Sequence, residues 1–463
     1  MDIAARNVVP DGGWGWVVVA AVALINMTNQ SILSVFGQLF AGRFEDDTFT
    51  AALITNLNSL ALNFSGLLIG PAIKSFKPRN VAATGCVLVS FGLALCSFAT
   101  QSWHLIVGYS CFVGLGLGLI SPSTFMAINS YFSSKRGRAV GVSLAGAGLG
   151  QVFMPHVVRY FLHTHGFRAA LLALAGISLL GLIGAVFLKP LHNNRKHLQL
   201  LADKEHKQQS SGLQAIIVQP RVVTAAPKTE TLCSRMGHRI VQAMDLELLK
   251  DIVFWSIIVG MALVYTATIN FTMVYPAFLK NTAGFDSKLI ASCMSVVAGA
   301  DIVFRLLLPC LTDRLRIPYR VVFLLGTVGM LAARVQLAET TSLPVIIAMS
   351  VLTGLAKSAT VINNNLTISA HCRAEKLAGG LGLSMITKGV VVITVGQLLG
   401  WIRDFSNSYV SCLYAQTALL LLVALVWTPE IYYRFRRQQK HLRNSMETTY
   451  VTHEQLEKLN TRA

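Results

Sequence analysis

Long apolar runs are the feature that most constrains this fold. Runs of about 18 or more mostly apolar residues recur along nearly the whole chain. A backbone that crosses a bilayer must satisfy its own hydrogen bonds, so each run predicts a membrane-spanning helix. The runs lie near residues 14–41, 48–74, 79–99, 103–130, 138–162, 167–188, 251–279, 288–311, 318–338, 343–366, 376–402 and 407–428. We therefore predict an all-α membrane protein with twelve transmembrane helices.

Composition agrees with a bilayer protein. Of the 463 residues, 53% are hydrophobic and 13% are charged, whereas a soluble domain carries about 25% charged residues. The first run is too long for the apolar part of a signal peptide, so we expect it to be retained as a helix. The eight cysteines are scattered, and neither metal-ligand spacing nor a nucleophile–base constellation nor a phosphate loop occurs. We expect no enzyme, no cofactor and no metal site.

The net charge of +18 follows the membrane topology. Basic residues gather in alternate connections, in residues 189–250 and in the tail, while the other connections carry few. Such asymmetry predicts that both termini and the central loop are cytoplasmic. It gives no reason to expect a nucleic-acid partner, and contact with anionic lipid is a secondary consequence. The connections concerned contain Lys74, Lys77, Arg79, Lys135, Arg136, Arg138, Arg314, Arg316 and Arg320.

One long polar stretch divides the chain into two halves of six spans. We predict a cytoplasmic N-terminus (1–13), a first half (14–188), a cytoplasmic loop that is mostly disordered (189–250), a second half (251–428) and a cytoplasmic tail (429–463). The halves echo each other, because Arg79 precedes Gly85 by the same spacing as Arg320 precedes Gly326. Six spans plus six is the layout of a major facilitator fold, whose substrate site lies between the halves.

A charge pair interrupts the run at 288–311. Asp301 and Arg305 are four residues apart, which places both side chains on one helical face within pairing distance. Charges at membrane depth normally face a bundle interior or a water-filled path and mark a functional site. The alternative is a structural ion pair that locks this helix to its neighbours.

Three motifs resemble those of the monocarboxylate transporter family, most closely its insect members. The first signature is Asp11-Gly12-Gly13-Trp14-Gly15-Trp16, and the second is Tyr131-Phe132-Ser133-Ser134-Lys135-Arg136-Gly137-Arg138-Ala139-Val140-Gly141. The third is the Asp301–Arg305 pair. The resemblance implies a plasma-membrane carrier of a small monocarboxylate that works by alternating access and is driven by a proton in some members. For some relatives it also implies a single-span ancillary protein as partner.

The residue types of the pair suit such a carrier. Arg305 is always charged, and its planar fork can hold a carboxylate at two points. Asp301 can titrate, since burial and the neighbouring cation act on it in opposite directions. We predict that a proton neutralises Asp301 and frees Arg305 for the substrate.

Further polar residues in the spans have either a functional or a purely structural role. We name Lys388, Asn29, Ser34, Asn58 and Tyr275 as additional substrate-binding candidates, with helix–helix hydrogen bonding or, for Lys388, snorkelling to the membrane surface as the competing account. Gating candidates are Asp11, Gly12, Gly13, Trp14, Trp16, Lys135, Arg136, Arg138, Asp313 and Arg314. Interfacial aromatic anchoring and ordinary topology charges are the competing accounts for these.

One position departs from the family pattern. Lactate carriers of the family have a lysine late in the first span, where this chain has Ser34. The loss of that cation favours, as an alternative, a proton-independent carrier of an amino acid, a carnitine-like compound or another organic solute. A non-transporting membrane sensor or scaffold is the rival from another class, but it has no evident need for the Asp301–Arg305 pair.

Overall fold

The computed structural model describes residues 11–36, 39, 48–189, 245–406 and 408–460. These residues contain twelve helical spans long and apolar enough to cross a membrane, which confirms the predicted fold class. The first half comprises α1 (Trp14–Asn29) with η1 (Gln30–Val35), α3 (Thr48–Phe64) with α4 (Gly66–Ser75), α5 (Pro78–Ser97), α6 (Ser102–Leu105) with η3 (Ile106–Val113) and α7 (Gly114–Tyr131), α8 (Arg136–Thr164) and α9 (Gly166–Phe187). The second comprises α12 (Ile252–Asn281), α13 (Ser287–Leu315), α14 (Tyr319–Glu339), α15 (Leu343–His371), α16 (Leu377–Ser406) and α17 (Tyr409–Asn460), preceded by η5 (Leu246–Lys250).

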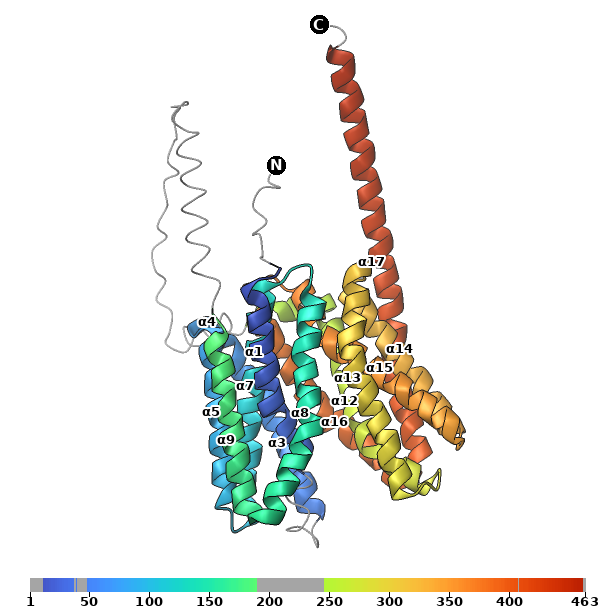
Figure 1. The fold of residues 1–463 in the computed structure, drawn as a ribbon. Coiled ribbons are helices and arrows are strands. Elements are labelled where there is room, and N and C mark those ends of the chain that lie inside the picture. Colours follow the sequence, from blue (N-terminus) through green and yellow to red (C-terminus); the bar gives the residue numbers. More distant parts are fainter. Residues whose placement is uncertain (1–10, 37–38, 40–47, 190–244, 407, 461–463) are drawn as a thin grey trace, which may run out of the picture.

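The two halves stand side by side, as Figure 1 shows. α8 packs against α13 and α4 packs against α16, and these two helix pairs form the largest contacts between the halves; α16 also contacts α3 and α7, and α15 contacts α8. Small residues permit this approach. A Cβ on Gly66 would overlap the carbonyl oxygen of Gly382, and the reverse is also true. A Cβ on Gly141 would likewise overlap the carbonyl oxygen of Arg305.

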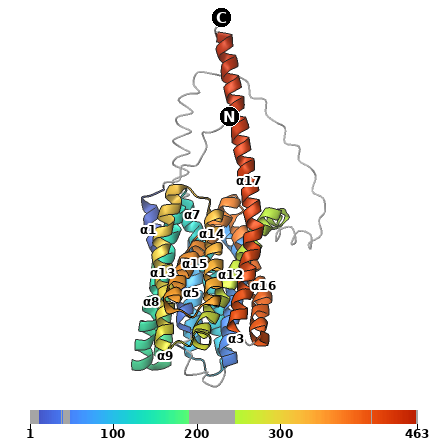
Figure 2. The same cartoon turned by 90° about the vertical axis from the view of Figure 1, so that its right-hand side faces the viewer.

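The end of the molecule that carries the start of α1 and the projecting part of α17 is called the loop side here (Figures 1 and 2). α9 ends there, since the Tyr131 hydroxyl donates to the carbonyl oxygen of Lys189 at 2.7 Å. The residues just before η5 return to the same side, where Lys74 at the end of α4 pairs with Asp245 at 2.7 Å. The predicted disorder of residues 189–250 falls almost wholly outside the described residues.

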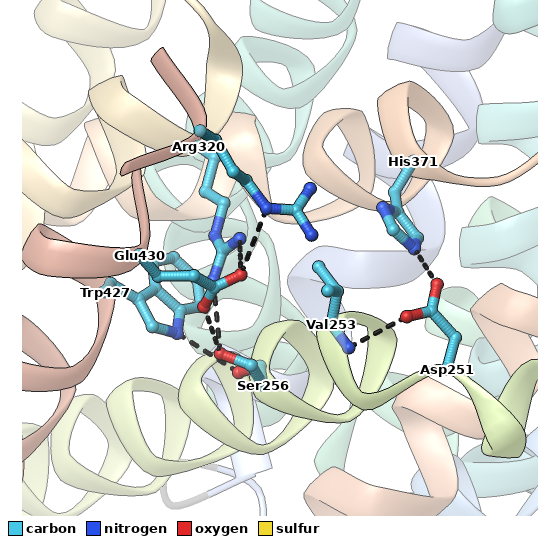
Figure 3. Close-up of polar contacts among 8 residues, drawn as sticks. Asp251, Val253, Ser256, Arg320, His371, Trp427 and Glu430 are labelled. Carbon is cyan, nitrogen blue, oxygen red and sulfur yellow. Dashed lines mark hydrogen bonds and ion pairs between the residues drawn. The ribbon is translucent and has the colours of Figure 1, made fainter. Parts of the chain in front are cut away.

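A polar clamp joins α12, α14 and α17 at their loop-side ends (Figure 3). Arg320 holds Glu430 through two hydrogen bonds of 2.8 and 2.7 Å, and the Ser256 hydroxyl donates to the same carboxylate. The Trp427 indole donates to the Ser256 carbonyl oxygen and lies beneath the Arg320 guanidinium. Beside this clamp, Asp251 accepts from the Val253 backbone and from His371, which ties the start of α12 to the end of α15.

Two features differ from the predicted elements. The last helix does not end at residue 428 but continues to Asn460, through Pro429. Residues 438–460 contain no Gly or Pro and many Gln, Glu, Lys and Leu residues, which favour helix. The first and fourth spans are also not uniform α-helices: η1 is a 3-10 segment, and η3 winds as a π-helix.

Candidate functional site

A cavity of about 400 Å³ lies between the two halves. It is lined from the first half by α1, η1, α3, α7 and α8, and from the second by α12 to α16. The first span changes from α-helix to 3-10 helix where Gln30 and Leu33 reach the cavity wall. Such irregular backbone at membrane depth is tolerated where it lines a cavity. The lining is mostly apolar but includes Asn26, Gln30, Asn63, Ser121, Thr124, Ser143, Gln151, Tyr265, Thr268, Arg305, Thr360, Asn364, Asn365, Ser384 and Lys388.

The predicted Asp301–Arg305 pair forms on α13. The Arg305 Nε and one terminal nitrogen donate to the two carboxylate oxygens of Asp301 at 2.9 and 2.8 Å, and both side chains are buried. The other terminal nitrogen of Arg305 donates to the carbonyl oxygen of Leu144 on α8, at 2.9 Å. The guanidinium therefore connects its own carboxylate with the backbone of the opposite half.

A second cation reaches Asp301 from α15. The Lys357 ammonium lies 3.1 Å from the Asp301 carboxylate. Gly354, one turn earlier, lets α15 approach α13 closely, because a Cβ there would overlap the Ala300 side chain and the backbone beside Asp301. Two cations and one carboxylate give this triad of Asp301, Arg305 and Lys357 a formal charge of +1.

Of the other substrate-binding candidates, only Lys388 lines the cavity. Its side chain is 8% exposed, and the ammonium lies 5.6 Å from the centre of the Tyr265 ring. Of the two accounts given for Lys388, a place in the central path and snorkelling to the membrane surface, the geometry agrees with the first, because the residue belongs to the cavity wall.

The remaining four candidates do not line the cavity, and their hydrogen bonds lie within one half. Asn29 accepts from the Ser178 hydroxyl of α9, and Asn58 donates to the Tyr109 carbonyl oxygen in η3. The Tyr275 hydroxyl pairs with Ser350 of α15. Ser34 is exposed and donates to the backbone of its own turn. For the three buried residues, helix–helix hydrogen bonding is the account that the geometry gives.

The first and second signatures meet at the loop side. Asp11 accepts hydrogen bonds from the backbone N–H groups of Ser133 and Ser134 at 2.6 and 3.0 Å, and from that of Lys135 at 3.4 Å. Burial alone would raise the pKa of Asp11, but the hydrogen bonds from Ser133, Ser134 and Lys135 outweigh it and hold the pKa below the ordinary 3.8. Asp11 therefore fixes the turn that leads into α8.

The start of α8 also binds the second half. The Asp313 carboxylate accepts from the Arg138 backbone N–H at 2.9 Å and lies 3.6 Å from the Arg138 Nε. A carboxylate at a helix N-terminus is favoured by the helix dipole. Gly137 makes room for it, because a Cβ there would overlap the carboxylate. We call Asp11, Asp313 and the turn of residues 133–138 the loop-side gate.

Other gating candidates surround this gate. Arg136 donates to the Phe132 carbonyl oxygen and reaches Ser369 of the second half at 3.5 Å. Trp16 contacts the Phe132 ring edge to face. Trp14 stacks against Lys189 at 4.6 Å, the carbonyls of Gly12 and Gly13 accept from the first turn of α1, and Arg314 is exposed at the end of α13.

Comparison with known proteins assigns the class of this two-halved fold. The sequence matches the Major Facilitator Superfamily over residues 19–396 and, in an overlapping match, 257–448, and the chain belongs to that family. The proton:xylose symporter XylE superposes with a TM-score of 0.64 at 13% identity, covering 89% of this chain and 94% of its own. A bacterial homologue of the iron transporter ferroportin, in an outward-facing state, gives 0.63 at 15% identity, with 90% and 98% covered. At these identities the likeness concerns the fold alone.

Within the family, the chain is related to monocarboxylate transporters. Monocarboxylate transporter 12 of Mus musculus is 25% identical over 438 residues, which cover 93% of this chain and 88% of that protein. Monocarboxylate transporter 13 of Rattus norvegicus is 27% identical over 426 residues, with 90% and 89% covered. Human monocarboxylate transporter 11 is 35% identical over 174 residues, 37% of each chain. These matches confirm the resemblance to the monocarboxylate transporter family, while the closer likeness to insect members stays a prediction. Because the relatives are transporters, the prediction that the chain is not an enzyme is confirmed too.

Proposed function

We propose that this protein is a plasma-membrane carrier that moves a small monocarboxylate by alternating access. The observation that carries the proposal is the cavity between the halves, whose wall contains a buried arginine held by an intramembrane carboxylate. A fixed cation recognises a carboxylate, and a position between the halves exposes it to either side in turn. The names of the relatives support the same class of substrate.

The Asp301–Arg305 pair supplies a route to proton coupling. All three guanidinium nitrogens of Arg305 are engaged, two with Asp301 and one with Leu144. A proton on Asp301 would release the guanidinium and raise the formal charge of the triad from +1 to +2. A substrate carboxylate on Arg305 would restore +1. Proton and anion would therefore each favour the binding of the other.

A proton-independent carrier is the second candidate, favoured by two observations. Lys357 supplies Asp301 with a second cationic partner, so the carboxylate is paired from two helices. The first span carries Ser34 at the position where lactate carriers have a lysine, and Ser34 does not line the cavity.

The loop-side gate supports a conformer closed on the cytoplasmic side. Asp313 of the second half binds the start of α8 in the first, and the Gly66–Gly382 contact lies in the other interface between the halves. With both termini cytoplasmic, as the charge asymmetry predicts, release of these contacts would open the cavity inward.

Uptake measurements test the proposal. Radiolabelled monocarboxylates are offered to oocytes that express the protein, with and without an inward proton gradient, after surface biotinylation has established delivery. If delivery fails, co-expression with a single-span ancillary protein is the next arm. We expect uptake that Arg305→Ala abolishes and that Arg159→Ala, an exposed arginine on α8, leaves unchanged.

The outcomes separate the candidates. Uptake that rises with the gradient supports proton coupling, and gradient-independent uptake supports the second candidate. Uptake that survives Arg305→Ala would overturn the role of that arginine. No uptake across amino acids, carnitine-like compounds and monocarboxylates, despite surface delivery, would support a sensor or scaffold instead.

A further inference from the structure

Lys388 occupies an unusual place in the cavity wall. It lies on the face of α16 that also presents Leu381, Ser384 and Met385 to the cavity, at helical spacing. The next residue, Gly389, touches Asn63 and Phe64 of the first half, so Lys388 stands at the seam between the halves.

Among the residues that the structure describes, the ammonium of Lys388 has no counter-charge. It makes neither an ion pair nor a hydrogen bond with them, and its contact is with the face of the Tyr265 ring. Arg305, the other cation of the cavity wall, has its three nitrogens occupied. None of the described lining residues is acidic. Of these two cations, Lys388 is the one available to an anion without any rearrangement.

An uncompensated charge at this depth is costly and calls for a function. Charged side chains in membrane proteins normally pair with one another or with a ligand. A cation–π contact with a ring face within about 6 Å offsets only part of the free energy that the ammonium loses on dehydration. A carboxylate that enters the cavity would supply the missing charge and the missing hydrogen-bond acceptor together.

The lining and the volume of the cavity indicate the polarity and the size of the rest of the ligand. The cavity that Lys388 lines also has an apolar wall, to which α3 and α12 contribute Leu62, Met261 and Val264. A cavity of about 400 Å³ holds on the order of twelve water-sized groups, at about 30 Å³ each. A three-carbon acid would leave most of that apolar wall against water. An acid with an apolar body of about ten carbon atoms would cover it.

We propose that Lys388 is the anchor for the substrate carboxylate, and that the preferred substrate is a monocarboxylate with a bulky apolar or aromatic body. This inference rests on the proposed carrier function and refines it. The carboxylate binds Lys388 on entry, while Arg305 is still paired with Asp301; binding to Arg305, as described above, follows only when a proton on Asp301 releases that pair. The apolar body lies between α3, α12 and α16.

Three variants test the anchor. Lys388→Met keeps the length of the side chain and removes the charge, Lys388→Arg keeps the charge, and Lys280→Met is the matched control at an exposed position on α12. The probes are 4-phenylbutyrate, lactate and the neutral 4-phenylbutyramide. The readouts are uptake into proteoliposomes and the shift of the thermal unfolding midpoint of the purified protein by each probe.

We expect Lys388→Met to raise the KM for 4-phenylbutyrate on the order of 30-fold or more, because the carboxylate loses its buried partner. Lys388→Arg should recover much of the affinity, and Lys280→Met should match wild type. Phenylbutyramide should neither compete for uptake nor stabilise the protein. Without ligand, Lys388→Met should unfold at the same or a higher temperature than wild type, since it removes an uncompensated charge. A purely structural lysine would give the opposite shift.

Each other outcome overturns a stated part. An unchanged KM in Lys388→Met overturns the anchor, and a lower KM for lactate than for phenylbutyrate overturns the substrate class. If wild type takes up no carboxylate, yet phenylbutyrate stabilises wild type and not Lys388→Met, the carrier function fails and the anion site stands. If phenylbutyrate gives neither uptake nor stabilisation, both fail.

Discussion

Asp301 is the residue on which the charge balance of the triad with Arg305 and Lys357 depends. Its carboxylate is shared between Arg305 on the same helix and Lys357 on α15. Loss of the Lys357 cation and loss of the Asp301 carboxylate have different consequences. Without Lys357, one cation and one carboxylate remain in balance. Without the carboxylate, two buried cations lie close together with no compensation.

We predict that Asp301→Asn lowers the free energy of unfolding by about 3–5 kcal/mol, the usual cost of breaking a buried pair from one side. Lys357→Met should cost clearly less, because the Asp301–Arg305 pair survives. Chemical unfolding of the purified protein in detergent measures both. Equal losses in the two variants would mean that Lys357, and not Arg305, is the principal partner of Asp301.

At this scale the sequence predicts local partners and misses distant ones. A spacing of four on one helix was enough to predict the Asp301–Arg305 pair. Lys357 belongs to another span, and nothing in the sequence states how two spans are rotated against each other. Because the rotation of the spans is not known from the sequence, the positions of Asn29, Asn58 and Tyr275 could not be predicted. Their polarity indicates a side that faces protein, but not whether that side meets the cavity or a neighbouring helix.

Among the elements, α8 is held at its start from two directions. Asp11 fixes the preceding turn from the beginning of the chain, and Asp313 binds the first turn from the second half. Two motifs that are about 120 residues apart therefore make one structural unit. The resemblance supplied both motifs, but their contact could not be derived from the sequence, because neither motif carries a sign of its partner.

The hydrogen bonds to Asp11 predict a specific pH dependence. Its pKa is lower in the folded protein than the ordinary 3.8, so its contribution to stability is present above that value and is lost as the pH falls through the folded pKa. The difference in unfolding midpoint between wild type and Asp11→Asn should be constant from about pH 8 to about pH 5 and shrink below about pH 4. Asp286→Asn, at an exposed acidic residue, is the control. A difference that already changes between about pH 6 and about pH 8 would contradict the assignment.

The clamp of α12, α14 and α17 predicts a contrast between two arginines that meet one carboxylate. Arg320 holds Glu430 at two points and is 12% exposed, whereas Arg434 lies 3.5 Å from Glu430 and is 47% exposed. Arg320→Lys should lower the free energy of unfolding by about 1–3 kcal/mol through loss of the two-point contact. Arg434→Ala should change it by less than about 0.5 kcal/mol, as is usual for a surface pair. Thermal unfolding of the two variants side by side decides the matter, and equal effects would exclude the two-point contact as the stabilising feature.

The positions of the helices were largely predictable, and their irregularities were not. Apolar runs give the spans to within a few residues because burial in lipid requires them. The 3-10 segment at Gln30 and the π-helix at Ile106 depend on neighbours: Gly108, for example, presses against Cys96 and Gly92 of α5. The end of α17 was missed because the polarity of residues 429–463 indicates contact with water and says nothing against a helix.

The described part of the molecule consists of two six-span halves that meet along a few closely packed surfaces. The reciprocal contact of Gly66 and Gly382 is one of these, and it brings backbone against backbone without a side chain between. Contacts of this kind favour discrete arrangements over gradual deformation. The six-plus-six layout was predictable from span count and loop charge, whereas the glycines that allow contact could not be told from the many others.

We predict that Gly382→Val shifts the protein away from the conformer with the closed loop side, because its side chain would overlap the Gly66 carbonyl oxygen. Gly400→Val, on the same helix with open space around it, is the control. Hydrogen exchange at residues 136–141, at the start of α8, should be faster in Gly382→Val than in wild type and in the control. Unchanged exchange there would show that the contact does not hold the loop side closed.

The length of α17 has a mechanical consequence. Its 52 residues span about 78 Å at about 1.5 Å per residue, more than twice the roughly 30 Å thickness of the hydrocarbon core. Because the first part is packed against α12, α14 and α16, the projecting part (Figure 2) is a continuous helical extension of the second half. A rotation that displaces the cavity wall by a small distance displaces the far tip by several times as much. A fluorophore at the tip would therefore act as a pointer that reads the tilt of one half against the other.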